Sequence, residues 1–156
     1  MKTKTTILEI EHDDLVNLFS TALYDHRNMT AMCNGEVPRE DGDCYEDMLA
    51  KCLLLGGSIS VVDRRANGEH YGSLPCVINE DDDAVYTVTL QDVTNGLERA
   101  CNGEFNLGEM SSSLTDLQEI EAHWAFHSFE RDSREWDAGS ADILIQVIVF
   151  DEIVYI

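Results

Sequence analysis

Positively charged side chains are scarce in this sequence. Ten Lys and Arg residues stand against thirty-one Asp and Glu residues over 156 positions, which gives a formal net charge of −21 at pH 7. A surface with this charge repels phosphate groups, so neither free nucleic acid nor an anionic membrane is expected as a direct partner. A basic protein is the kind of macromolecular partner that the charge favours.

The sequence also lacks a long apolar run and a paired set of cysteines. Its most apolar stretch, residues 143–150, is interrupted by Gln146 and is far too short to span a membrane. The first ten residues contain no apolar signal segment, so we expect a cytoplasmic protein. The cysteines are odd in number and include no CxxC pair, which predicts reduced thiols at Cys33, Cys44, Cys52, Cys76 and Cys101.

Catalytic signatures are missing as well. There is no G-x-S-x-G elbow, phosphate loop or dinucleotide fingerprint, so we expect no catalytic residue and no cofactor. His123 and His127 lie four residues apart and could hold one metal ion on a helix, but Trp124 stands where a metalloprotease needs Glu. Structural or surface roles are favoured for both histidines, and a metal-dependent hydrolase is kept as an alternative.

Hydrophobic residues make up 44% of the chain, enough for a packed core, and their spacing indicates mixed secondary structure. Alternating or β-branched segments predict strands at residues 5–11, 58–63, 71–78 and 84–89. Asn67-Gly68 is a hairpin signal between the second and third strands, and residues 79–83 form a turn before the fourth. Pro75 predicts that the third strand is an edge strand or carries a bulge.

Helical spacing of apolar residues predicts helices at 13–24, from Asp43 to Gly56, from Thr89 to about residue 101, at 114–129 and at 140–155. Asp43 with Glu46, and Thr89 with Asp92, resemble capping boxes. The final segment is rich in β-branched residues, but we expect a helix that is buried nearly all round. Residues 25–42 are polar and predict a loop.

Together these segments predict one acidic α+β domain over residues 1–156. Its core would be a three- to four-stranded antiparallel meander packed with four or five helices. The apolar last segment leaves a homodimer contact open as a second use of its surface.

The carboxylates are clustered rather than evenly spread. Two clusters could occupy the phosphate sites of a nucleic-acid-binding protein and pair with its Arg and Lys side chains. They comprise Glu36, Glu40, Asp41, Asp43, Glu46 and Asp47, and the turn Glu80, Asp81, Asp82 and Asp83. An acidic, solvated surface without a specific partner is the alternative interpretation.

Four blocks of the sequence are similar to a family of small acidic proteins from phages and mobile elements of gut bacteria. The blocks are DDLVNLFSTALY at 13–24, YTVTL at 86–90, NGLE at 95–98 and ADILIQVIVF at 141–150. The loop at 33–41 departs from the family, and no functional residue is carried over. The resemblance implies a context in which small acidic proteins inhibit host defence, including anti-restriction and anti-CRISPR proteins.

These observations lead to one expectation and its rivals. We expect a non-enzymatic inhibitor that mimics nucleic acid and binds the basic groove of a host nuclease or CRISPR effector through the two carboxylate clusters. The rivals are the metal-dependent hydrolase and a dimeric adaptor whose acidity only confers solubility.

Overall fold

The computed structural model describes residues 10–22, 29–101, 138–152 and 154–155. These residues form an α+β fold with helices α1 (His12–Ala22), α2 (Tyr45–Leu54), α3 (Leu90–Cys101) and α5 (Ala138–Phe150). Strands β1 (Met29–Asn34), β2 (Ser58–Asp63), β3 (Cys76–Ile78) and β4 (Ala84–Thr89) make one antiparallel sheet. The predicted fold class is therefore confirmed.

The sheet has the order β1-β2-β4-β3, and its register runs without a break. At one end Asn34 pairs with Ser58, which pairs with Thr89 on its other side. At the opposite end Asp63 pairs with both Met29 and Ala84. The strands predicted at 58–63 and 84–89 are confirmed, and β3 lies at an edge as Pro75 predicted.

The hairpin predicted at Asn67-Gly68 is wrong, although the turn exists. Both residues have positive φ, 49° and 82°. The strand that follows does not return beside β2, because β4 occupies that place. Of the strand predicted at 71–78, only β3 is formed. Gly72 (φ 74°) and Pro75, which has no N–H, interrupt this segment, whereas β4 offers six uninterrupted residues for pairing.

The loop predicted at 25–42 is wrong over β1. This strand pairs with β2 along all six of its residues. Met29 and Ala31 are buried, while Met32 on the opposite face is 54% exposed. Ala, Met and Asn have no marked preference for strands, so pairing with β2 rather than local propensity forms this element.

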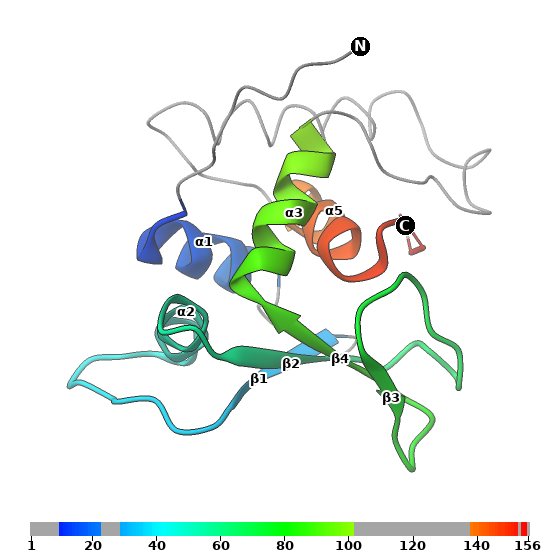
Figure 1. The fold of residues 1–156 in the computed structure, drawn as a ribbon, viewed down its shortest axis with the longest axis horizontal. Coiled ribbons are helices and arrows are strands. Elements are labelled where there is room, and N and C mark those ends of the chain that lie inside the picture. Colours follow the sequence, from blue (N-terminus) through cyan, green and yellow to red (C-terminus); the bar gives the residue numbers. More distant parts are fainter. Residues whose placement is uncertain (1–9, 23–28, 102–137, 153, 156) are drawn as a thin grey trace.

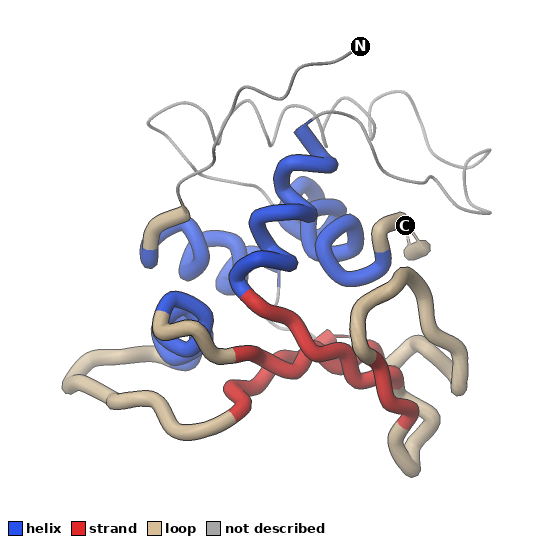
Figure 2. Tube along the Cα trace, in the orientation of Figure 1, coloured by secondary structure: helices blue, strands red, loops and turns tan. Residues whose placement is uncertain are grey.

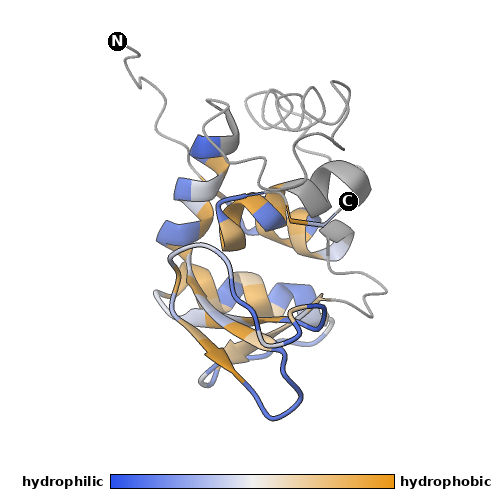
Figure 3. Cartoon of the chain, turned by 90° about the vertical axis from the view of Figure 1, so that its right-hand side faces the viewer, coloured by the Kyte–Doolittle hydropathy of each residue, from blue (hydrophilic) through white to orange (hydrophobic). Residues whose placement is uncertain are grey.

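All four described helices lie on one face of the sheet (Figure 1). Figure 2 shows the same layering, with the strands below the helices and no described helix or strand on the other face of the sheet. In Figure 3 the apolar residues gather between the helices and strands, and the connecting loops are hydrophilic. Within the described ranges, helices thus cover one face of the sheet and no helix or strand covers the other, which is called the open face below.

The final segment is the buried helix that the sequence predicts, and it packs against both α1 and α3. The predicted end near residue 155 is wrong, because Asp151 has a left-handed φ of 56° and α5 ends at Phe150. Residues 144–150 are all buried, including the polar Gln146. The Gln146 side chain accepts hydrogen bonds from the backbone N–H groups of Val154 and Tyr155 and donates one to the Tyr155 carbonyl. Its amide is thus satisfied within an apolar layer. Gly96 of α3 lets α3 approach α5 closely, since a Cβ there would lie 2.6 Å from the Ile148 Cα.

Two further predictions concern the helix starts. The Thr89–Asp92 capping box at the start of α3 is confirmed, with the Thr89 N–H donating to Asp92 Oδ2 (2.9 Å) and the Asp92 N–H to Thr89 Oγ1 (3.3 Å). The box predicted for Asp43 and Glu46 is wrong by one residue. Cys44 caps α2, and its partner is Asp47, because the Asp43 carboxylate is used elsewhere.

The remaining predictions fall largely outside the described residues. They are the strand at 5–11, of which only residues 10 and 11 are described and lie outside any strand, and the helix at 114–129 that carries His123 and His127. In the described part of the chain, no helix has the length and apolar character needed to cross a membrane.

Candidate interaction surface

The first acidic cluster forms a structured loop between β1 and the first turn of α2. Glu36, Glu40 and Asp41 are exposed on this loop. Asp43 and Asp47 turn inward, and their side chains are only 14% and 23% exposed. Glu46, in the first turn of α2, is half-buried. The other five carboxylates are of two kinds, one facing solvent and one holding the loop in shape.

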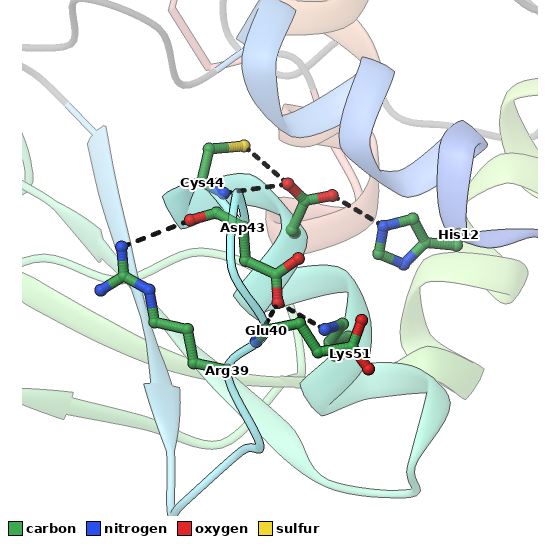
Figure 4. A network of polar contacts seen from close by, with 7 residues as sticks. His12, Arg39, Glu40, Asp43, Cys44 and Lys51 are labelled. Carbon is green, nitrogen blue, oxygen red and sulfur yellow. Dashed lines mark hydrogen bonds and ion pairs between the residues drawn. The ribbon is translucent and has the colours of Figure 1, made fainter.

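Asp43 fixes the middle of the loop (Figure 4). Its Oδ2 accepts a hydrogen bond from the Glu40 N–H at 2.9 Å and forms an ion pair with Lys51 Nζ. Arg39 donates to the Asp43 carbonyl at 3.3 Å. The Lys51 ammonium, followed by the Glu40 N–H, lowers the pKa of Asp43 below its ordinary value of 3.8.

Asp47 joins the same loop to α1. It accepts hydrogen bonds from the Cys44 thiol and the Cys44 N–H, both at 3.0 Å, and its Oδ1 lies 2.8 Å from His12 Nε2 (Figure 4). The Cys44 thiol and N–H, together with His12, lower the pKa of Asp47 to about 2. The carboxylate therefore connects the two helices across the base of the loop.

The contact between Cys44 and Asp47 does not resemble a nucleophilic site. In such a site an imidazole touches the thiol and takes its proton. Here the carboxylate touches the thiol, and the hydrogen bond to Asp47 raises the pKa of Cys44. A thiol that keeps its proton is a poor nucleophile, so Cys44 acts as a hydrogen-bond donor.

The second acidic cluster is the turn between β3 and β4. Asn79 organises it, because its Oδ1 accepts the N–H groups of Asp81 (2.9 Å) and Asp83 (3.0 Å). Asp83 is buried and lies 3.8 Å from Arg64, whereas Glu80, Asp81 and Asp82 are exposed. The role of Asn79 was not predicted, although an Asn before an acidic turn is a recognised signal for this geometry.

The two clusters lie at diagonally opposite corners of the sheet. The first follows Asn34, at the end of edge strand β1 where Ser58 and Thr89 also lie. The second follows Ile78 of the other edge strand, at the end where Ala84 and Asp63 lie. In Figure 1 both loops extend towards the open side of the sheet, one beyond β1 and the other beyond β3. The predicted contact residues thus form two separate patches.

Other polar groups have structural partners. A small cavity is lined by Ser73, Asp92, Asn95 and Arg99, among others. The Arg99 guanidinium pairs with Asp151 at 2.7 Å and donates to the Val147 carbonyl at 3.0 Å, so it neutralises the end of α5. Among the described residues no group of three His, Cys, Asp or Glu side chains could hold a metal ion.

Comparison with protein-family models, with curated proteins and with solved structures gives no match for this chain.

Proposed function

We propose that this protein is a non-enzymatic inhibitor that binds a basic, nucleic-acid-binding protein through its acidic loops. The target would be a host defence nuclease, of the restriction or CRISPR type. The exposed carboxylates would take the places of nucleic-acid phosphates in the target's groove and pair with its Arg and Lys side chains.

The observation that carries this proposal is that some carboxylates of the first acidic loop hold its backbone in shape while others face solvent. Asp43 and Asp47 hold the loop through hydrogen bonds to backbone groups and through Lys51 and His12. Glu36, Glu40 and Asp41 are thereby presented to solvent on a fixed backbone. A preformed array loses less conformational freedom on binding than a flexible acidic tail would.

The exposed carboxylates of the second loop add a separate contact. Asn79 and the buried Asp83 fix the turn, and Glu80, Asp81 and Asp82 face solvent. The formal charge of −21 supplies the long-range field that would steer a cationic partner towards both loops. The resemblance to phage and mobile-element proteins supplies the biological context, an inhibitor of host defence.

The test begins with affinity capture from lysates of gut bacteria, using the immobilised full-length chain. Each captured nucleic-acid-binding protein is purified, and its binding to labelled DNA or RNA is measured with increasing amounts of the chain. The proposal predicts competition that weakens as salt is raised, because exposed charge pairs are screened. Capture that leaves nucleic-acid binding and cleavage unaffected would overturn the proposal.

A further inference from the structure

The open face of the sheet contrasts with the rest of this acidic chain. Its side chains alternate with those that point into the core, and the register brings them into rows across the strands. One row is Met32, Ser60 and Thr87, and the next is Thr30, Val62, Val85 and Val77. A third row, Asn34, Ser58 and Thr89, closes the face at the first acidic loop.

None of these described side chains carries a charge, although the chain has thirty-one acidic residues. Exposed apolar groups lie on its two edge strands, since Met32 is 54% and Val77 is 69% exposed, whereas Val62 in the middle of the face is buried. The Asn34 side chain is hydrogen-bonded within the face, donating to the Ser58 hydroxyl (3.1 Å) and accepting from the Ser60 hydroxyl (2.8 Å). An uncharged centre costs less free energy to remove from water than a charged one, provided that its hydroxyl groups form hydrogen bonds with the partner.

The charges lie at the margins of this face. The loop with Glu36, Glu40 and Asp41 follows one corner, and the turn with Glu80–Asp82 follows the diagonally opposite corner. Protein interfaces commonly have such an anatomy, with charge depleted at the centre and polar groups at the rim. The two acidic corners therefore lie on one diagonal of the face, with uncharged strands between them.

We infer that the open face is a docking surface for an extended segment of the basic partner, which rests on the function proposed above. The segment would carry uncharged side chains across the strands and cationic side chains at both ends. A strand of six residues is about 17 Å long and four strands are about 14 Å across, so the corners are at least ~22 Å apart. The two cationic ends are therefore separated by about seven extended residues or more.

The charge pattern selects this occupant over two others. A second copy of the chain would bring another surface of the same net negative charge against this one, and like charges repel. Nucleic acid would place its phosphates beside the same carboxylates. A segment with cations at both ends and an uncharged middle complements the corners and the centre together.

The test uses a displayed library of random peptides of about 15 residues, selected on the full-length chain. The enriched sequences should carry Lys or Arg on both sides of an uncharged stretch of about seven residues. One enriched peptide is then synthesised, and its affinity is measured for the wild-type chain and for the variants Thr87→Glu and Thr87→Arg. Both variants place a charge in the middle of the face, and both should weaken binding at least tenfold.

The two opposite substitutions separate docking on the face from attraction by charge. If only the electrostatic field mattered, Thr87→Glu would tighten binding of a cationic peptide and Thr87→Arg would weaken it. Matched controls are Asn95→Glu and Asn95→Arg, on an exposed helical position on the covered side of the sheet. They should change affinity by less than threefold. If a Thr87 variant fails to fold, Met32→Glu and Met32→Arg test the same row on an exposed edge position.

Different failures point to different conclusions. In one outcome, cationic peptides bind the Thr87 variants as tightly as the wild type but lose affinity for the triple variant Glu36→Lys, Glu40→Lys, Asp41→Lys. This result would overturn the docking surface and leave the acidic-loop proposal standing. Enrichment of peptides without cations, insensitive to that reversal, would count against both. A library that yields no binder, or a chain that dimerises through this face, would also overturn the docking surface.

Discussion

His12 Nε2 and Asp47 Oδ1 lie 2.8 Å apart, which links the first residue of α1 to the first turn of α2. The same carboxylate accepts two hydrogen bonds from Cys44 at the start of α2. Asp47 therefore anchors the base of the loop, Asp43 holds its middle, and Glu36, Glu40 and Asp41 face solvent.

The first prediction concerns pH and Asp47. Its pKa lies at about 2 in the folded chain, below its ordinary value of 3.8. A lowered pKa contributes stability that is fully present above the ordinary value and is lost as pH falls through the folded value. Asp47→Asn should therefore be less stable than the wild type at pH 6, and the difference should shrink as pH falls from about 4 to about 2. Urea unfolding of both proteins measures it, and a difference that is constant over this range would contradict it.

The second prediction concerns the ion pair between Asp43 and Lys51. Lys51→Met removes the ammonium that chiefly lowers the pKa of Asp43. We expect the loop to open more often, so the Glu40 N–H, which donates to Asp43, should exchange with solvent faster. Hydrogen exchange followed by NMR measures this, and the Gly68 N–H, bonded to the Asp82 carbonyl in the distant turn, serves as the control. Unchanged exchange at Glu40 would show that the ion pair does not hold the loop.

The third prediction concerns a buried carboxylate that the sequence did not single out. Asp63 is fully buried and accepts hydrogen bonds from the Tyr155 hydroxyl (2.8 Å) and the Arg65 N–H (3.0 Å). Tyr155→Phe should lower the free energy of unfolding by about 1.5–3 kcal/mol, as for a hydrogen bond to a charged group. Tyr71→Phe is the control, because the Tyr71 hydroxyl donates to the exposed Glu69 at 3.2 Å and its loss should cost less than about 0.5 kcal/mol. Equal effects of the two variants would contradict this assignment.

The fourth prediction concerns the contact between α3 and α5. A Cβ at Gly96 would lie 2.5 Å from Ile148 Cγ1 and 2.6 Å from the Ile148 Cα, so part of the clash is with backbone and cannot be relieved by a rotamer change. Gly96→Ala should therefore destabilise the fold by about 1–3 kcal/mol, despite the better helix propensity of Ala. Asn95→Ala, at the exposed neighbouring position, should stay within about 0.5 kcal/mol of the wild type in the same denaturation experiment. A stabilised Gly96→Ala variant would show that the two helices can move apart.

Much of the fold was predictable because its signals are local. Apolar periodicity located α1, α3 and α5, and alternation located β2 and β4. β1 was missed because its residues have little strand preference and become a strand by pairing with β2. The strand order was missed because the turn signal at Asn67-Gly68 suggests that β2 pairs with the next strand in the chain. In the structure β2 pairs instead with β4, which is more distant in the sequence.

The sequence identified the residues of the two acidic clusters, but not which of their side chains face solvent or where the clusters lie on the sheet. Charge and composition located Glu36 to Asp47 and Glu80 to Asp83. They could not indicate that Asp43, Asp47 and Asp83 face inward, since that depends on Lys51, His12 and Arg64 from other elements. Nor could they place the two clusters at opposite corners, because that follows from the sheet register.

The most direct test of the account compares two triple variants with the same net charge. One is Glu36→Lys, Glu40→Lys, Asp41→Lys on the first acidic loop, and the other is Glu11→Lys, Asp13→Lys, Glu69→Lys at exposed positions outside both clusters. Affinity for a captured nucleic-acid-binding protein is measured for each. We predict at least a tenfold loss for the loop variant and less than a threefold change for the other, whereas equal losses would show that bulk charge, not the arrangement of the loop, determines binding.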